Sequence, residues 1–555
     1  MKKYVLSLLL LTFALTMSAT VRPTAKMQQA ASKVMNGSKA QVTLSKHTLD
    51  VFNDGNRFAI VSRDDRFPEI LAYGMGNFDI EKAPANVKWW FEAVQRCMEN
   101  AVKQNAPRRA ATAYTAVEPF ITTKWGQSTP YNNYCPVFEA DKTKAPSGCV
   151  ATAMAQIINY WQYPASATFE GGYTIDKKDK TVQVASTYSF PYQLAYGIYL
   201  PTADADPEEM KYTPSQGNKV ATLMRDCGYS VNMNYTADGS GASTVAAGNA
   251  LAEKFSYPKD AVRYVDREWF TDEAWMKLIQ TELANKSPIL YAGGSENSGG
   301  HAFVFHGMDT EGKVFVNWGW QGQYDGYYAI DLLTPGDDDF SLYQEAVVGI
   351  RTKALDGEVY HSFFYTDKPY TFKYDQATTK LSVTLVQDVY NMTCHHFTGR
   401  WSLVIEDMNN REKTVILDLL EKGTTVEYFG GYEAQTLSLG KGTFDPGTYR
   451  LYMATEDTGE VSWQYVQTVG GGMYYELTAA ADGTVTLAST PTYTDGYPKN
   501  LPSTPTAIRK VKTGNITPAT APVRYYDLQG REVSGSTKGL IIRRQGDEVK
   551  KVLVK

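Results

Sequence analysis

The sequence predicts a protein of several domains that belongs to the α+β class. The chain has 555 residues, which is more than one compact domain usually holds. Its 43% of apolar and 13% of aromatic residues are typical of a globular protein with a large core. Helix-like and strand-like apolar patterns follow one another up to about residue 352, and strand-like alternation dominates after it.

Charge and cysteine content argue against several classes of protein. The formal net charge is −5 and the basic residues are dispersed, so nothing electrostatic indicates nucleic acid or an anionic membrane as a partner. The five cysteines lie far apart without a CxxC pair, which indicates neither a dense disulfide framework nor a zinc site. The odd number leaves at least one thiol unpaired. No cluster of ligand residues implies a metal or an organic cofactor.

The first 19 residues have the features of a secretory signal peptide. Lys2 and Lys3 precede the apolar run YVLSLLLLTFAL, and small residues follow near Ala19. The run has about a dozen residues, whereas a spanning helix needs about 20, so an uncleaved membrane anchor is the weaker alternative. We therefore predict a secreted protein, extracellular or associated with the cell surface, without a membrane-spanning segment.

Residues 20–112 have the pattern of a small α+β unit. The segments FAIVSRDDRF and PEILAYG alternate like strands, and NVKWWFEAVQRCMENAVKQ places Val87, Trp90, Phe91 and Val94 at helical spacing. The stretch NAPRRAATAYTA that follows has the composition of an exposed linker open to proteolysis. We therefore place a domain boundary at the end of this unit.

Three further segments follow the linker. Residues 113–355 mix helical and strand patterns and contain the groups that could carry chemistry. In residues 356–495, apolar and polar residues alternate in runs such as LSVTLVQDVYNM and WSLVIEDM, and Gly and Asp residues typical of turns separate the runs. This pattern predicts a β-sandwich. Residues 496–555 contain short strand-like runs such as KGLIIRR, which predict a small β tail.

Cys149 is the first candidate for a catalytic group. In the stretch SGCVATAMAQIINYWQYP, Val150, Met154 and Ile157 fall on one face of a helix that begins at Cys149. Unpaired N–H groups and the positive end of the helix dipole favour a thiolate at such a place, and the thiolate is the nucleophilic form. A cysteine near a helix start is also found as a small buried apolar residue, so a functional interpretation requires a base nearby.

His301 and His306 are the histidines inside the central segment. The run GGHAFVFHGMD has the pattern of a strand, in which these two side chains point to opposite faces. We favour His301 as the general base, because Gly300 before it would let a substrate backbone approach. His306 is more simply interpreted as a half-exposed histidine with a local partner. His301 follows Cys149 by 152 residues, as in papain-like cysteine proteases.

Three further residues could complete a catalytic site. Asn317 ends the strand-like run VFVN and could orient the imidazole, and Trp318 after it could shield that ring from water, although a tryptophan loop packed on the core is an alternative. The amide of Gln127 could complete an oxyanion hole together with the N–H of Cys149.

Four runs in this order closely resemble the streptopain family of secreted cysteine peptidases, which includes interpain-like proteins: WGQSTPYNNYCP, GCVATAMAQIINYWQYP, GGHAFVFHGMD and VNWGWQGQYDGYY. The resemblance covers about residues 21–352. It implies a papain-like two-lobed catalytic domain at 113–355, preceded by a prodomain at 20–112 that inhibits the enzyme within the same chain until proteolysis removes it. The partners implied are protein and peptide substrates, with an apolar residue two places before the scissile bond.

The resemblance also implies the role of each candidate residue. Cys149 would be the nucleophile and His301 the general acid and base, with Gln127 in the oxyanion hole. Asn317 and Trp318 would orient and shield the histidine. The backbone of Gly300 and the loop at 239–243 that contains Ser240 and Gly241 would line the substrate cleft.

The chain departs from the family in its C-terminal half and allows other interpretations. Streptopain ends after the catalytic domain, whereas the segments at 356–495 and 496–555 resemble the C-terminal modules of interpain-like proteins; the tail could be a sorting element or merely a small β domain. The alternative function is an inactive surface binding or adhesion protein that uses the β modules. A transglutaminase or cell-wall amidase is disfavoured, because those enzymes typically pair the histidine with an Asp where this chain has Asn317 and Trp318.

Overall fold

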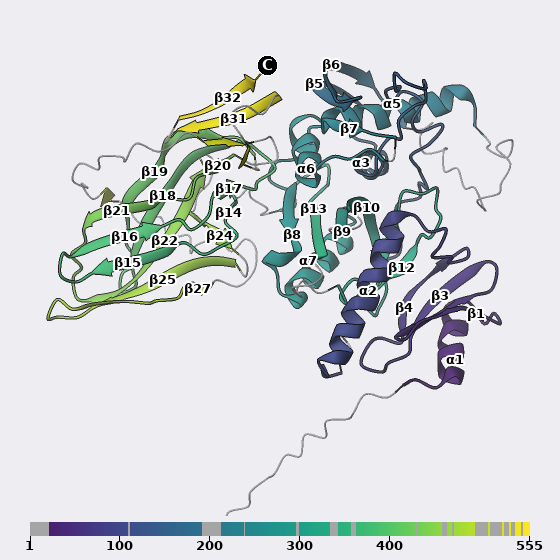
Figure 1. The fold of residues 1–555 in the computed structure, drawn as a ribbon, viewed down its shortest axis with the longest axis horizontal. Helices are drawn as coiled ribbons and strands as arrows, with labels where there is room; N and C mark the ends of the chain where they lie inside the picture. Colours follow the sequence, from purple (N-terminus) through teal and green to yellow (C-terminus); the bar gives the residue numbers. More distant parts are fainter. Residues whose placement is uncertain are drawn as a thin grey trace, which may run out of the picture.

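The computed structural model describes residues 21–493 with gaps, and several strands between residues 509 and 554 (Figure 1). The gaps before residue 494 are 109–111, 191–211, 238, 296–298, 334–341, 357–361, 429, 458–462 and 469–470. The predicted signal peptide at 1–19 and the predicted boundary at 495 lie outside the described residues. Within the described ranges, no helix is long and apolar enough to cross a membrane.

The N-terminal unit, residues 21–108, consists of two helices and four antiparallel strands. Its elements are α1 (Thr24–Val34), β1 (Gln41–Ser45), β2 (Leu49–Asn53), β3 (Arg57–Ser62), β4 (Ile70–Met75) and α2 (Ala85–Lys103). Helix α1 packs on the sheet through Met27, Ala30 and Ala31, in a small core of its own. Helix α2 instead packs against β9 and β10 of the central domain, and its buried side chains belong to the main core of the protein.

Ten strands form one sheet that continues from the N-terminal unit into the central domain, residues 113–355. The order is β1-β2-β3-β4-β12-β11-β10-β9-β13-β8. The strands of the central domain are β8 (Arg263–Asp266), β9 (Ile289–Ser295), β10 (Gly299–Met308), β11 (Val314–Asn317), β12 (Gly326–Tyr328) and β13 (Leu342–Val348). At the joint, β4 pairs antiparallel with β12, where Gly74 faces Gly326 and Tyr73 faces Tyr327. The two tyrosine rings stack with centroids 4.9 Å apart.

The other half of the central domain is mainly helical and is built around α3. Its elements are α3 (Cys149–Trp161), β5 (Ser166–Ile175), β6 (Lys178–Thr187), α5 (Pro214–Ser230), β7 (Met233–Tyr235), α6 (Thr244–Glu253), the short helix η2 (Arg267–Trp269) and α7 (Asp272–Ala284). Every residue of α3 from Val150 to Asn159 is buried, because the helix packs against α5 on one side and β10 on another. A helical lobe therefore meets a sheet lobe at α3 and β10, which confirms the predicted α+β class and two-lobed catalytic domain.

The segment after residue 361 is a β-sandwich, as predicted, and we call it the sandwich module. Its strands are β14 (Phe364–Tyr365), β15 (Thr371–Asp375), β16 (Lys380–Thr384), β17 (Val389–Asn391), β18 (Phe397–Asp407), β19 (Lys413–Val426), β20 (Gly431–Tyr432), β21 (Thr436–Lys441), β22 (Gly447–Asp457), β23 (Gln464–Tyr465), β24 (Gln467–Thr468), β25 (Gly471–Ala479), β26 (Val485–Leu487) and β27 (Thr492–Tyr493). The small sheet β15-β16-β21 shares one apolar core with the large sheet, and Phe372 packs edge-on against Tyr475 of β25 with ring centroids 5.4 Å apart.

The sandwich module is packed against the central domain. Trp269 contacts Phe363 and Tyr365 with ring centroids 4.3 and 5.0 Å away. Asn249 Nδ2 donates to the backbone oxygen of Cys394 at 2.8 Å, and the Cys394 side chain belongs to the main core. Apolar side chains from the central domain and from the sandwich module therefore share one buried cluster. The two parts are joined by packing as well as by the connecting chain.

The tail contains short strands, in agreement with the alternation in its sequence. β28 (Arg509–Lys510) pairs with β19, and a separate antiparallel sheet has the order β30-β29-β31-β32. The strands of that sheet are β29 (Arg524–Tyr526), β30 (Glu532–Val533), β31 (Gly539–Gln545) and β32 (Glu548–Val554).

Candidate active site

Cys149 is the first residue of helix α3, as the sequence predicted. The residue before it, Gly148, has φ 89°, a conformation that side chains other than glycine rarely adopt. A Cβ at this position would also lie 2.8 Å from the Met233 side chain and 2.9 Å from the backbone oxygen of Ser240. Glycine is therefore required on both grounds, and the close approach fixes the start of the helix against the loop around Ser240.

The Cys149 thiol lies against strand β10. The backbone N–H groups of Ala302, Val150 and Cys149 itself point toward the sulfur and favour its thiolate form. Burial outweighs these donors and raises the pKa of the thiol above its ordinary value. The lowered pKa expected from the helix start is thus not found in this form of the protein, because packing around the sulfur removes the water that would solvate the anion.

His301 lies on β10 immediately before Ala302, whose N–H reaches the Cys149 sulfur. Across the sheet, His301 is paired with Gly293 of β9. The side chain of His301 is half-buried. Helix α3 and strand β10 therefore bring Cys149 and the His301 segment together from two different lobes, as the papain-like arrangement predicts.

Asn317 belongs to a buried amide network that the sequence did not indicate. Its Nδ2 donates to the backbone oxygen of Thr123 at 2.8 Å and to Gln156 Oε1 at 2.9 Å. Its Oδ1 accepts from Gln156 Nε2 at 3.1 Å and from the Gly319 N–H at 3.0 Å. Gln156 thus ties helix α3 to the end of β11. The predicted orientation of His301 by Asn317 stays a prediction.

Trp318 begins the loop that connects β11 with β12. Its ring packs on Phe303, with centroids 4.6 Å apart, and edge-on against Tyr328 at 5.1 Å. Phe303 lies two residues after His301 on β10, so both side chains share one face of the strand. Only 1% of Trp318 is exposed, and its backbone N–H donates to Asp325 Oδ1 at 3.0 Å. The predicted apolar shield is therefore a buried indole beside the histidine strand.

The other predicted site residues lie on the segments that flank Cys149. The Gln127 backbone oxygen accepts from the Ser147 N–H at 3.0 Å, two residues before Cys149. Ser240 Oγ donates to the backbone oxygen of Pro146 at 2.7 Å. A Cβ added to Gly241 or to Gly300 would meet no atom within 4 Å, so both positions border open space. The structure thus leaves space beside both glycines, and the roles of these residues in a substrate cleft stay predictions.

His306 is fully packed rather than half-exposed, which corrects the expectation from the sequence. Only 2% of it is exposed, and its Nδ1 accepts the backbone N–H of Ile121 at 3.1 Å. The ring packs edge-on between Phe120 and Phe315. Burial lowers the pKa of His306 to about 3, so the ring stays neutral and serves packing and hydrogen bonding.

Helix α2 of the N-terminal unit lies on the loop and strands that carry these residues. Asn86 Nδ2 donates to the Trp318 backbone oxygen at 3.1 Å, and Trp320 Nε1 donates to Asn86 Oδ1 at 2.9 Å. The indole of Trp89 covers Gly293, the residue paired with His301, so closely that a Cβ on Gly293 would overlap the ring. The N-terminal unit therefore occupies the surroundings of the candidate base.

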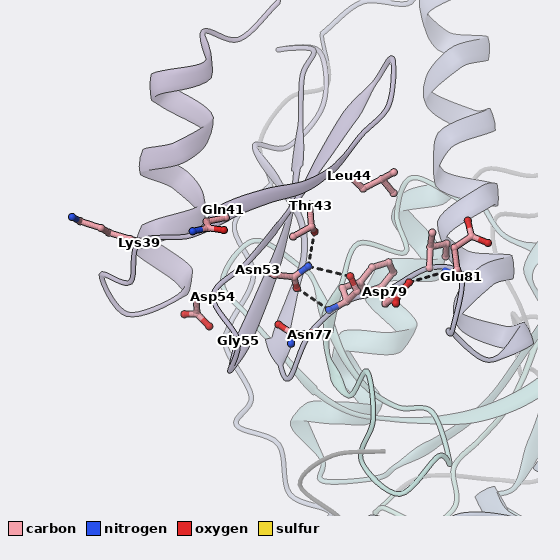
Figure 2. A pocket seen from close by; sticks show the side chains of 12 residues that line it. Lys39, Gln41, Thr43, Leu44, Asn53, Asp54, Gly55, Asn77, Asp79 and Glu81 are labelled. Carbon is pink, nitrogen blue, oxygen red and sulfur yellow. Dashed lines mark hydrogen bonds between the residues drawn. The ribbon is translucent and has the colours of Figure 1, made fainter. Parts of the chain in front are cut away.

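A cavity of about 670 Å³ lies in the N-terminal unit, away from these residues (Figure 2). It is bordered by β1, the end of β2 and residues 77–81, and Asn53 in its wall bonds to Thr43 and to the backbone oxygen of Phe78. It contains none of the predicted site residues. Over the residues that the structure describes, no three His, Cys, Asp or Glu side chains are grouped to hold a metal ion.

Comparisons with known proteins identify the families that the two halves of this region resemble. Residues 125–328 match the peptidase C10 family, and residues 16–98 match the Spi protease inhibitor family. Streptopain from Streptococcus pyogenes is 32% identical over 338 residues, which are 56% of this chain and 82% of streptopain. The thiol protease/hemagglutinin PrtT from Porphyromonas gingivalis is 31% identical over 391 residues, which are 62% of this chain but only 44% of PrtT.

A solved fragment of prointerpain A from Prevotella intermedia is 32% identical, covers 57% of this chain with 99% of its own length, and superimposes with a TM-score of 0.49. On the sequence matches, the chain belongs to the peptidase C10 family of cysteine peptidases, with an N-terminal inhibitor unit of the Spi type.

Proposed function

We propose that the protein is the precursor of a secreted cysteine endopeptidase, in which Cys149 is the nucleophile and His301 the general acid and base. The observation that carries this proposal is that two elements meet. Helix α3 begins at Cys149, and the Cys149 sulfur accepts a hydrogen bond from the N–H of Ala302, the residue next to His301. A nucleophile and a base from two lobes, in a member of the peptidase C10 family, are the minimum that peptide hydrolysis through a thioester needs.

The chemistry follows from these positions. The Cys149 thiol gives its proton to His301, and the sulfur attacks the carbonyl carbon of the scissile peptide bond. The oxygen becomes an oxyanion, stabilised by the N–H of Cys149 at the helix start and by the amide of Gln127. When the C–N bond breaks, the imidazolium of His301 donates its proton to the leaving amine. Water then attacks the thioester with His301 as base, releases the carboxylic acid and restores the thiol.

The N-terminal unit is the inhibitory prodomain in this proposal. Asn86 binds the loop of Trp318, and Trp89 covers the strand position paired with His301. Burial raises the pKa of Cys149, which keeps the nucleophile protonated while the unit is in place. Cleavage in the linker near residue 112 would release these contacts, admit water and substrate, and allow the helix start to favour the thiolate.

The segments outside the catalytic domain suggest the destination of the protein. The residues at 1–19 have the pattern of a signal peptide, so we place the enzyme outside the cell or at its surface. The sandwich module would accompany the catalytic domain as a fixed part, because Trp269 and Asn249 contact it directly. The substrates of the enzyme would be proteins and peptides with an apolar residue two places before the cleaved bond.

The decisive experiment measures casein hydrolysis by the chain without its first 19 residues, before and after limited proteolysis. We expect activity to appear on cleavage near residue 112 and to disappear with a thiol-reactive epoxide, in Cys149→Ala and in His301→Ala. The matched controls are Cys135→Ala, which removes a buried thiol that stays in the cleaved enzyme, and His396→Ala, which removes an exposed histidine; both should keep full activity. A cleaved, reduced wild-type protein that hydrolyses nothing would refute the proposal.

A further inference from the structure

The loop from Trp318 to Asp325 is closed on itself by a buried carboxylate. Asp325, the last residue before β12, accepts the backbone N–H of Trp318 through Oδ1 at 3.0 Å. Only 7% of Asp325 is exposed. Two backbone bonds fold the loop between these ends: the Gln323 N–H donates to Trp320 at 3.0 Å, and the Asp325 N–H donates to Gly322 at 3.3 Å. The carboxylate thus joins the first residue of the loop to its last.

The position of this loop affects the surroundings of the candidate base. The indole of Trp318 packs on Phe303 with centroids 4.6 Å apart, and Phe303 shares a strand face with His301. The other side of the indole meets Tyr328 of β12. A shift of the Trp318 backbone would therefore open the apolar wall beside His301 and admit water to the imidazole.

In the precursor, the N-terminal unit holds the same loop from outside. Asn86 bonds to the backbone oxygen of Trp318 and to the indole N–H of Trp320. At the other end, β4 pairs with β12, and Gly74 approaches the backbone oxygen of Asp325 so closely that a Cβ there would lie 2.5 Å away. All of these contacts are lost when the N-terminal unit leaves.

Contacts from the central domain remain after that loss. The Gln321 N–H donates to the backbone oxygen of Trp125 at 3.2 Å, and the Gly319 N–H donates to Asn317 Oδ1 at 3.0 Å. The bond from Trp318 to Asp325 also remains, and it holds the backbone of the shielding tryptophan itself. A bond to an ionised acceptor is about twice as strong as a bond between neutral groups, so the charge of Asp325 matters to it.

The charge of Asp325 changes in the neutral pH range. Burial raises the pKa of Asp325 to about 7, against the N–H of Trp318 and the positive charge of Lys124, which both favour the carboxylate. Tyr328 is the titratable group that faces Asp325 from β12, and its hydroxyl stays neutral because burial raises its pKa. From the side of β4, backbone atoms of Gly74 face the end of the loop.

We propose that Asp325 is a positioning residue of the mature peptidase, which holds Trp318 against Phe303 after the N-terminal unit has left and so keeps the wall beside His301 closed. The inference rests on the proposed function of Cys149 and His301 and names a residue that acts through Trp318 rather than on the substrate.

The test compares matured wild-type enzyme with Asp325→Asn and Asp325→Ala, using a peptide substrate between pH 5.5 and 8.5. Asp325→Ala removes the acceptor, and we expect kcat to fall by about tenfold or more, with a smaller change in KM. Asp325→Asn keeps an amide oxygen as acceptor but cannot ionise, so it should restore only part of the kcat that Asp325→Ala loses. Removal of β4 uncovers the backbone beside Asp325, so the pKa of about 7 found in the precursor is an upper value for the matured enzyme. A carboxyl group with that pKa is about one tenth ionised at pH 6 and about nine tenths at pH 8, so the ratio of kcat at pH 8 to kcat at pH 6 should be smaller in Asp325→Asn than in wild type by a factor of at most about nine.

Two controls separate positioning from simple loss of folded enzyme. Active sites are counted with the thiol-reactive epoxide so that kcat refers to intact enzyme only, and quenching of tryptophan fluorescence by iodide reports exposure of the loop. Asp260→Asn, at an exposed aspartate of the same domain, should match wild type in every readout.

Each outcome decides between the hypotheses. Variants with wild-type kcat per active site, wild-type pH profile and wild-type quenching would overturn the role of Asp325 while the proposed function stands. If Asp325→Ala does not fold, the pH profile of Asp325→Asn decides alone, and an unchanged profile overturns the role. If matured wild type is as inactive as Cys149→Ala, the proposed function itself fails.

Discussion

The packing of Trp89 beside the strand of His301 predicts that inhibition of the precursor depends on this one side chain. The indole lies over Gly293, the partner of His301 in the sheet, and near Phe303 with centroids 6.2 Å apart. Only 2% of Trp89 is exposed, and among the described residues its indole N–H has no hydrogen-bond acceptor, so the contribution of Trp89 is packing. Trp89→Ala should therefore weaken the attachment of α2 to the central domain.

The size of the effect follows from the burial of this side chain. Replacing a core tryptophan by alanine destabilises a protein by about 3 to 5 kcal/mol. Part of that free energy holds α2 within its own unit, and we assign about half of it, roughly 2 kcal/mol, to the contact with the central domain. Because 1.4 kcal/mol is a factor of ten, the fraction of precursor with an open site should rise about thirtyfold.

The assay measures the rate at which iodoacetamide alkylates Cys149 in the intact precursor, with Cys149→Ala to identify the labelled thiol. The matched control is Glu92→Ala, an exposed position on the same helix, which should label at the wild-type rate. Met27→Ala damages only the separate core of the N-terminal unit and shows how much opening general destabilisation causes. If Trp89→Ala labels no faster than Glu92→Ala, the indole does not hold the site closed and the reasoning is wrong.

Three other predictions concern the interfaces and the buried histidine. Gly74→Val should disrupt the pairing of β4 with β12 and raise the labelling rate of Cys149 in the precursor; an unchanged rate would show that the sheet joint is dispensable. His306 stays neutral when folded, whereas the unfolded chain binds a proton below pH 6.5, so its contribution to stability is present above that pH and lost as the pH falls toward 3. The loss of unfolding free energy between pH 7 and 5, measured by urea denaturation, should be smaller by about 2 kcal/mol in His306→Asn, and equal losses in both proteins would contradict the burial argument. Trp269→Ala should lower the melting temperature and increase proteolysis after residue 355, which a module that is merely tethered would not show.

The sequence predicted the catalytic elements because their signals are local. The apolar stripe after Cys149 and the alternation around His301 each lie within one helix or strand, whose periodicity depends on neighbouring residues. The same approach missed Gln156, which lies on the predicted helix but is polar and was therefore outside the apolar stripe. A polar amide between Ala155 and Ile157, seven positions after Cys149 in an otherwise apolar run, was the signal that could have indicated the network with Asn317.

Three features depend on tertiary structure and could not be predicted from the local sequence. The apolar residues of helix α1 include the small Ala30 and Ala31, and polar residues surround them in the sequence, so no clear apolar stripe predicts the helix. Packing on the sheet nevertheless buries both alanines in a small core. The pairing of β4 with β12 joins residues that are about 250 positions apart and depends on docking of the whole unit. The raised pKa of Cys149 also depends on tertiary structure. The dipole of α3 belongs to the helix alone, whereas the burial of the sulfur depends on segments that are distant in the sequence.

The ten-stranded sheet loses its first four strands when the N-terminal unit is removed. Strands β1 to β4 leave together, and β12 becomes the outermost strand, with the backbone groups that faced Gly74 and Tyr73 now unpaired. Open edges recruit foreign strands and promote aggregation, most of all when they are long and flat. Here the new edge is three residues long and begins at Gly326, which limits how many bonds an intruding chain could form. Maturation thus creates an edge too short to be a strong template, while the precursor keeps it covered.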